Sequence, residues 1–244
     1  MSMLSKYEAE FIRRKKWYGK VDLFICPSEF YRMKLQESGF TSSKIVTIRN
    51  PLPLDTEYCQ NTTNDGYILY FGRLSKEKGV KTLIDAVTKT GDRLVIVGTG
   101  LMEDQWKTYA EDASNVEFKG FQTGAALANS VKNSRCVVLP SEWYENGPYA
   151  IAEASACGTP CIVSNLGGLP EAVEDGVNGY VCQAGNAGDL AQKMDRIFTL
   201  SPEEYEAMCQ AAVEKAKRDY NAQAYLDKLL ALYTELLEQK RRNP

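Results

Sequence analysis

Residues that could bind a phosphate follow the apolar run at 67–71. The loop Gly72-Arg73-Leu74-Ser75-Lys76-Glu77-Lys78-Gly79 combines glycines with a guanidinium at Arg73 and an ammonium at Lys78, directly before a predicted helix. Two fixed cations beside a helix N-terminus suit a diphosphate, which needs charge neutralisation and bidentate donors. A solvated basic loop is the alternative, and position alone favours neither.

Two carboxylates lie eight positions apart in the segment 140–160. Glu145 is in the loop before a helix predicted to begin at Pro148, and Glu153 is inside that helix. Free backbone amides at the helix start predict an anion site around Asn146, Gly147, Pro148 and Tyr149. Because Glu153 stands among small apolar residues, its carboxylate needs a partner, either two sugar or ribose hydroxyls or a lysine or arginine.

Two further strand ends carry glycine turns. Gly98-Thr99-Gly100 lacks the third glycine of a dinucleotide-binding fingerprint, because position 103 is a glutamate. A tight turn explains these glycines about as well as close approach to a ligand does. In Gly120-Phe121-Gln122, the ring of Phe121 and the amide of Gln122 could flank a nucleobase, although an aromatic residue beside a glycine more often packs in a core.

The elements that must position these residues alternate from residue 67 to about 186. Runs rich in β-branched residues (YILYFG, RLVIVG, NVEFKG, RCVVL, PCIVS and GYVC) alternate with helical patterns that begin near Val80, Leu101, Thr123, Pro148 and Gly167. Strands that are apolar throughout and separated by helices indicate a parallel sheet covered on both faces. We therefore predict a Rossmann-like, doubly wound α/β domain that binds ligands at the carboxyl ends of its strands.

Shorter segments flank this domain, which is predicted at 61–220. Residues 1–60 indicate a basic helix, a strand at 21–26, a helix from the N-cap Ser28 to Gly39, a strand at 44–48 and a linker. From residue 187 the chain is predicted to be helical, with helices at 187–200, 202–219 and 222–241. The last helix, in a C-terminal segment 221–244, has an apolar face that must pack on something, remain exposed or drive dimerisation.

Composition limits the chemistry and the partners. The 244 residues carry a net charge of -3, which gives no attraction to nucleic acid, and they include no histidine, so carboxylates, cations and amides must perform any catalysis. Seven scattered cysteines fit a reducing cytosol, and no clustered Asp-x-Asp motif predicts a metal site. We find no export signal or apolar run of membrane-spanning length, and expect a cytoplasmic protein. The basic stretch at 13–16 favours a solvated helix face over anionic lipid, so any membrane contact is peripheral.

Three motifs resemble one enzyme family. FGRLSKEKG, the paired glutamates of SEWYENGPYAIAEASACGTP and the later NLGGLPEAVEDGVNGY are similar to the family four retaining glycosyltransferases of the GT-B fold, also called glycosyl transferases group 1. The resemblance is strong over residues 66–186 and looser over VDLFICPSEF to KIVTIRNPLP. The chain departs from the family in Asn146-Gly147-Pro148-Tyr149, where many members have Gly-Phe-Gly, in its lack of histidine and in its short first domain.

The resemblance implies a role for each candidate residue. Arg73, which follows Gly72, and Lys78 match the pair that holds the donor diphosphate, while Glu145 matches the glutamate that faces the donor sugar. Glu153 matches the glutamate that binds the donor ribose. The remaining donor-site residues are implied to be Asn146, Gly147 and Tyr149 beside the sugar and phosphates, and Phe121 and Gln122 beside the nucleobase.

The implied activity is transfer of a hexose from a UDP- or GDP-sugar to a saccharide or lipid-linked saccharide, in polysaccharide or glycoconjugate synthesis. It requires neither cofactor nor metal and retains the sugar configuration by front-face attack, with double displacement through Glu145 as the alternative. The short first segment implies that most of the acceptor domain belongs to a separate chain or to a longer one. A donor-binding module without turnover and a GT-B sugar-nucleotide epimerase are the other hypotheses.

Overall fold

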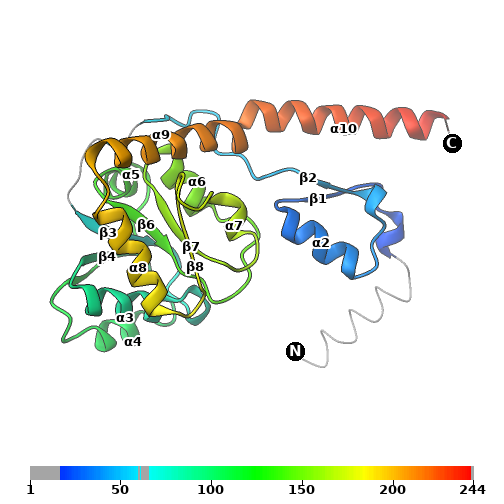
Figure 1. Ribbon diagram of the computed structural model, residues 1–244. Coiled ribbons are helices and arrows are strands. Elements are labelled where there is room, and N and C mark those ends of the chain that lie inside the picture. Colours follow the sequence, from blue (N-terminus) through cyan, green and yellow to red (C-terminus); the bar gives the residue numbers. More distant parts are fainter. Residues whose placement is uncertain (1–16, 60, 62–65, 243–244) are drawn as a thin grey trace, which may run out of the picture.

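The structure is a computed structural model that describes residues 17–59, 61 and 66–242 (Figure 1). The basic stretch at 13–16 lies outside these residues, and of the first predicted helix only a short 3-10 helix at Trp17–Lys20 is described. Figure 1 shows a large α/β body and a small unit of two strands and a helix, with the final helix α10 (Ala222–Arg242) extending from the body beside the small unit.

Six parallel strands form the sheet of the large body, in the spatial order β5-β4-β3-β6-β7-β8. The strands are β3 (Tyr67–Phe71), β4 (Arg93–Val97), β5 (Val116–Gly120), β6 (Cys136–Leu139), β7 (Cys161–Ser164) and β8 (Gly179–Cys182). Every residue of β3, β6 and β7 is buried, as in a parallel sheet covered on both faces. The predicted doubly wound α/β fold is confirmed.

Helices follow the strands at the predicted places. They are α3 (Val80–Thr90), α4 (Glu103–Tyr109), α5 (Gly124–Lys132), α6 (Tyr149–Ala156), α7 (Leu169–Ala172), α8 (Ala187–Phe198) and α9 (Pro202–Asp219). Helix α3 buries an apolar stripe at helical spacing, formed by Val80, Leu83, Ile84 and Val87. Helix α8 packs against α3, and α9, which begins with a Ser201–Glu204 capping box, packs against α6.

The strand order reverses at β3. This strand pairs with β4 on one side and with β6 on the other. The loop after β3 (residues 72–79, the β3 loop) and the loop after β6 (residues 140–148, the β6 loop) therefore leave the sheet side by side. In sheets of this type, right-handed crossovers place the helices of the two halves on opposite faces, and ligands bind beside the loops at this switch point.

The small unit, termed the N-terminal module (residues 24–47), consists of β1 (Phe24–Cys26), α2 (Glu29–Glu37) and β2 (Ile45–Thr47). Its two strands are parallel, and both are shorter than the sequence predicts. The predicted N-cap is confirmed, because Ser28 Oγ accepts a hydrogen bond from Tyr31 N at 3.2 Å.

The linker after β2 is attached to the body by backbone hydrogen bonds. Leu52 N donates to Tyr220 O at 2.9 Å, and Cys59 N donates to Ala156 O at 3.0 Å. These bonds tie the linker to the end of α6 and to the residue that follows α9. The domain boundaries near residues 60 and 220 stay predictions.

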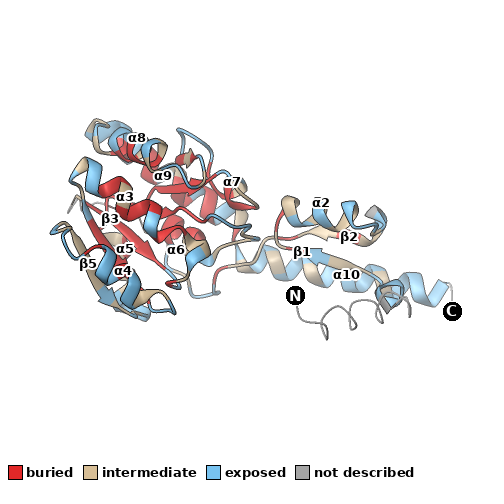
Figure 2. Cartoon of the chain, turned by 90° about the horizontal axis from the view of Figure 1, so that it is seen from below, coloured by how far each residue is buried: buried red, intermediate tan, exposed pale blue. Residues whose placement is uncertain are grey.

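Helix α10 lies beside the N-terminal module (Figures 1 and 2). Lys240 Nζ pairs with Asp22 Oδ2 at 2.8 Å, and Lys228 Nζ donates to Thr47 O at 3.2 Å. No residue of α10 is buried, and its exposed large apolar side chains are Leu226, Leu230, Tyr233 and Leu237. The apolar surface of this helix is thus only partly covered by the described part of the chain. None of the described helices is long and apolar enough to cross a membrane.

Candidate functional site

The β3 loop and the β6 loop are in direct contact. Gly79 ends the β3 loop with a left-handed backbone (φ +68°), and a Cβ atom there would lie 1.9 Å from the carbonyl oxygen of Pro140. Glu142 N also donates to Glu77 O at 2.8 Å across the same contact. Glycine at position 79 therefore allows the close approach that aligns the two loops.

These loops bring Lys78 and Glu145 together. Lys78 Nζ donates to Glu145 Oε1, and the two side chains are only 19% and 18% exposed. The buried Ser141 donates its hydroxyl to the same oxygen at 3.0 Å. One predicted phosphate-binding cation and the predicted sugar-facing carboxylate thus form an ion pair. The sequence reasoning missed Ser141, although its place just after a strand end was an available indication.

Arg73 has a different partner. Its Nη2 bonds to Glu77 Oε1 at 2.8 Å, and 67% of its side chain is exposed. Ser75 Oγ donates to the same oxygen at 2.7 Å, and this bond is the largest cause of a lowered pKa at Glu77. Among the described residues, the side chains of Arg73 and Lys78 share no ion-pair partner. Because exposed ion pairs are weak, the guanidinium remains available to an anionic ligand.

Arg73 and Gly72 line a cavity of about 470 Å³ at the ends of β3, β4 and β5. Phe121, Gln122 and Leu127 complete the lining with the turn at 97–100. Small-ligand sites typically span about 300–1,000 Å³, so the cavity has room for a nucleoside. Phe121 is 71% exposed and is therefore not a core residue, contrary to the simpler expectation for an aromatic residue beside a glycine.

Gly98 and Gly100 have a structural explanation. A Cβ atom on Gly98 would lie 1.9 Å from Gly72 O, and one on Gly100 would lie 2.3 Å from Leu74 O. Gly98 also has a positive φ of +140°. The close backbone approach at these glycines is therefore an approach to the β3 loop.

Glu153 lines a second cavity, of about 360 Å³, together with Leu52, Lys132 and Cys157. Leu127 borders both this cavity and the one that contains Arg73, so the two are adjacent. Desolvation raises the pKa of Glu153. Among residues 17–59, 61 and 66–242, no side chain contributes a hydrogen bond or an opposite charge to this pKa. The salt bridge considered as its alternative fate is thus not formed there, and the carboxylate can accept hydrogen bonds from a ligand.

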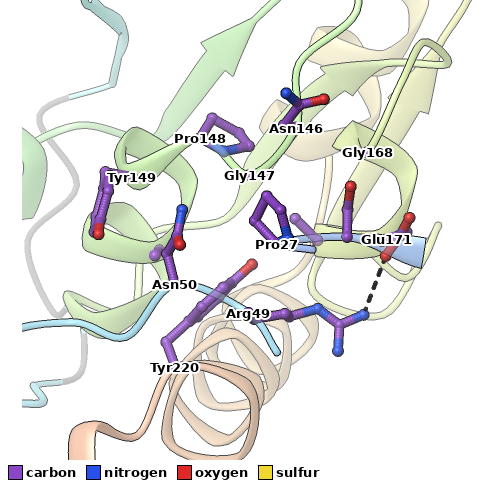
Figure 3. Close-up of a pocket in the computed structure, with 13 residues that line it drawn as sticks. Pro27, Arg49, Asn50, Asn146, Gly147, Pro148, Tyr149, Gly168, Glu171 and Tyr220 are labelled. Atoms are coloured by element: carbon purple, nitrogen blue, oxygen red, sulfur yellow. Dashed lines mark hydrogen bonds and ion pairs between the residues drawn. The ribbon is translucent and has the colours of Figure 1, made fainter. Parts of the chain in front are cut away.

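A third hollow lies between the body and the N-terminal module (Figure 3). Residues 146–149 of the body face Pro27 of the module across it. Helix α6 begins here at Tyr149, one residue after the predicted start, and Pro148 provides no side-chain cap. Ile151 N donates to Pro148 O at 3.2 Å, and the free volume of the hollow is about 10 Å³, enough for one water molecule. Pro27, Asn50 and Glu171 also line this crevice and were missed as site residues. The NLGGLPE motif, which contains Glu171, was the available indication.

The candidate residues therefore occupy four places rather than a single pocket, with Asn146, Gly147 and Tyr149 in the hollow beside the N-terminal module. Lys78 and Glu145 form a pair, Arg73, Phe121 and Gln122 share one cavity, and Glu153 lies in the next. Across the described residues, no group of three or more histidine, cysteine, aspartate or glutamate residues is placed to hold a metal ion.

Comparison with known proteins identifies relatives of this chain. The sequence model of the family "Glycosyl transferases group 1" matches residues 59–218. The uncharacterized glycosyltransferase MJ1607 of Methanocaldococcus jannaschii is 38% identical over 143 residues, covering 54% of this chain and 35% of that protein. The putative colanic acid biosynthesis glycosyltransferase WcaL of Escherichia coli is 25% identical over 251 residues, covering 96% of this chain and 61% of that protein.

The chain spans 35% to 61% of the length of these two curated relatives. Among solved structures, HepE of Anabaena in complex with UDP superposes with a TM-score of 0.78 at 21% sequence identity. The superposition covers 88% of this chain and 64% of HepE. At this level of identity the likeness shows that the two proteins share a fold.

Proposed function

Because this chain belongs to the glycosyl transferases group 1 family, we propose that it binds a nucleoside-diphosphate sugar at the switch point and transfers the sugar to an acceptor hydroxyl with retention of configuration. The observation that carries the proposal is the Lys78–Glu145 pair where the β3 and β6 loops meet. In this proposal the cation contacts the phosphate and the carboxylate contacts the sugar of one ligand, and the meeting of the two loops at the switch point supports it.

Lys78 and Arg73 hold the donor diphosphate in this proposal. Lys78 is paired with Glu145, and a diphosphate would offer it another anionic partner. As the bond from the anomeric carbon to the phosphate oxygen breaks, negative charge grows on the leaving diphosphate. Fixed cations and the first amides of α6 stabilise that charge, and one well-aimed donor of this kind contributes about 2.7–4 kcal/mol in other enzymes.

Glu145 orients the donor sugar and does not attack it. Its Oε1 atom already accepts hydrogen bonds from Lys78 and Ser141, which lowers the nucleophilicity of that oxygen. The acceptor oxygen instead bonds to the anomeric carbon from the face that the diphosphate leaves. The proton of the acceptor hydroxyl passes to the departing phosphate oxygen, and the configuration is retained. Double displacement through Glu145 is the alternative mechanism, and it would have to use the other carboxylate oxygen, Oε2, or free Oε1 from Lys78 and Ser141.

The nucleoside lies across the two adjacent cavities. Glu153 accepts hydrogen bonds from the ribose hydroxyls, while Phe121 and Gln122 flank the base. UDP is the preferred nucleotide in this proposal, since HepE is a structural neighbour in complex with UDP. The WcaL relative supports a role in polysaccharide or glycoconjugate synthesis. The donor is a substrate, and the proposal includes no resident cofactor or metal.

Turnover requires an acceptor site, for which the described part of the chain supplies only the N-terminal module. The chain spans 35% to 61% of its curated relatives, so the proposal assigns the rest of the acceptor side to a longer chain or to a separate one. By itself the chain then functions as a donor-binding unit.

Isothermal titration calorimetry with UDP, GDP, ADP and uridine tests the proposal. We expect one diphosphate to bind with micromolar affinity and uridine to bind at least about tenfold more weakly, because uridine lacks the anion that Lys78 and Arg73 contact. Absence of binding by all three diphosphates would contradict the donor site.

A further inference from the structure

Glu171 of the body caps a helix that belongs to the N-terminal module. Its Oε1 accepts a hydrogen bond from Phe30 N at 2.7 Å, and its Oε2 accepts one from Glu29 N at 3.0 Å. Both amides are in the first turn of α2, where no backbone partner exists within the helix. A carboxylate at this end also interacts favourably with the helix dipole. The Glu171 side chain thus caps a helix whose first residues lie 141 and 142 positions earlier in the chain.

The same carboxylate is balanced by a cation at the junction. Arg49, in the segment that leaves the module, places Nη2 3.5 Å from Glu171 Oε2 (Figure 3). Its Nη1 lies 3.9 Å from Asp219 Oδ2. The side chains of Arg49 and Glu171 are 31% and 21% exposed, so both are largely shielded from water. Glu171 therefore bonds to the module at α2 and to its exit segment at Arg49.

The start of α7, which carries Glu171, also contacts the β6 loop. Gly168, just before α7, donates its amide to Glu145 O at 2.6 Å. A Cβ atom on Gly168 would lie 2.9 Å from Asn146 O and 3.0 Å from the Cβ atom of Ser28, the N-cap of α2. The start of α7, the β6 loop and the start of α2 are thus in contact with one another. A shift of Glu171 relative to α2 would change the distance between the module and Glu145.

We propose that Glu171 is a positioning residue that fixes the N-terminal module against the β6 loop by capping α2. The module forms the wall of the crevice opposite residues 146–149, so its placement sets where an acceptor can approach the donor sugar. This consequence for the acceptor rests on the proposed function, whereas the fixed placement of the module does not.

Hydrogen exchange measured by mass spectrometry tests the role of Glu171 in the intact chain. We compare Glu171→Ala and Glu171→Gln with a matched control, Glu174→Gln. Glu174 bonds to Lys215 and Arg218 within the body and makes no bond to the module in the described part of the chain. We expect the alanine variant to raise exchange at Glu29 and Phe30 by about tenfold or more, while strands β3 to β8 remain protected. Glutamine should restore part of the protection, because its amide oxygen still accepts one bond.

Three outcomes would overturn the proposal. These are unchanged exchange at the start of α2, an equal increase in the Glu174→Gln control, and a uniform increase over the whole chain, which would mean general destabilisation. UDP titration of each variant separates this proposal from the proposed function. We expect the UDP affinity of the Glu174→Gln control to stay within about threefold of the parent chain, because Glu174 lines none of the three cavities described above. If the parent chain fails to bind UDP, the donor site is wrong, but the exchange data still decide the role of Glu171.

Discussion

Lys78 and Glu145 are 67 residues apart in the chain and form an ion pair where the strand order of the sheet reverses. Both side chains of the pair are mostly shielded from water. Lys78 therefore cannot bind a diphosphate without sharing or replacing its carboxylate partner. This competition gives opposite expectations for substitutions of the two residues.

Replacing Lys78 by alanine should weaken binding of UDP. The substitution removes a charge-assisted bond to the diphosphate and leaves Glu145 as an unpaired negative charge beside it. A hydrogen bond to a charged group contributes about 1.5–3 kcal/mol, which corresponds to an increase of roughly 10- to 100-fold in the dissociation constant. Calorimetric titration with UDP and uridine measures the effect, and uridine binding should not change. Lys76→Ala, an exposed lysine of the same loop, is the control, and equal losses in both variants would refute a specific role for Lys78.

Replacing Glu145 by glutamine should preserve or strengthen UDP binding and abolish sugar transfer. The neutral amide no longer competes for Lys78, so UDP affinity should stay equal or rise by up to about tenfold. Transfer should fall at least about 100-fold, because the sugar loses its carboxylate partner. Calorimetry gives the first quantity. Release of UDP from the nucleotide sugar in the presence of an acceptor gives the second, measured together with the longer or separate chain that supplies the acceptor side. Glu142→Gln, on the same loop, is the control. Weaker UDP binding in Glu145→Gln would show that the two groups do not compete.

The contribution of Arg73 to UDP binding should depend on the shape of its guanidinium group as well as on its charge. Its side chain is exposed and paired with Glu77, so Arg73→Ala should change the free energy of unfolding by less than about 1 kcal/mol. UDP affinity should fall about tenfold in Arg73→Ala and remain reduced in Arg73→Lys, because lysine cannot make a bidentate contact. Urea unfolding and UDP titration provide the two measurements. Arg93→Ala, which removes an exposed arginine paired with Glu117 at the start of β4, should leave UDP binding intact.

The sequence predicted the fold well because the strands and helices have strong local patterns. β3 is apolar along its whole length, and α3 has an apolar stripe, so both could be assigned without tertiary information. The β3 and β6 loops were assigned as site loops because ligands bind after the strands of such sheets. The bonds from Glu171 to α2 could not be predicted, since they join segments 141 and 142 residues apart.

Side-chain environments within the site were harder to predict than the elements that carry them. The alanines around Glu153 suggested a buried, paired carboxylate, but the residue lies on the outer side of α6 while Ala152 and Ala154 are buried. Small residues on a short helix do not define which face is covered, because that depends on α9 and the linker. Phe121 was similarly ambiguous, and only the packing of the turn after β5 shows it to be exposed.

Replacing Glu153 by glutamine should raise the stability of the fold and weaken ligand binding. Its pKa is raised above the ordinary value of 4.5 because the charged form is desolvated. The folded state therefore binds this proton more tightly than the unfolded state, and stability falls as pH rises through 4.5 and the higher folded-state pKa. At pH 7 the free energy of unfolding of Glu153→Gln, measured with urea, should exceed that of the parent by less than about 1 kcal/mol. This difference should disappear at pH 4. The same variant should bind UDP more weakly, since an amide is a poorer acceptor for ribose hydroxyls. A stability gain that persists at pH 4 would assign the effect to packing rather than to charge.

Gly79 should be far more sensitive to substitution than Gly91, although both have a left-handed backbone. A Cβ atom on Gly91 would meet no atom within 4 Å, so Gly91→Ala should cost only the conformational strain, about 1 kcal/mol. A Cβ atom on Gly79 would lie 1.9 Å from Pro140 O, which is a backbone atom and cannot rotate away. Gly79→Ala must therefore separate the β3 and β6 loops, and we expect it to lose more than about 2 kcal/mol of stability and to weaken UDP binding by moving Lys78 away from the site. Urea unfolding and UDP titration of both variants measure these effects. Equal losses of stability for the two alanines would mean that the contact between the loops does not determine the geometry of the site.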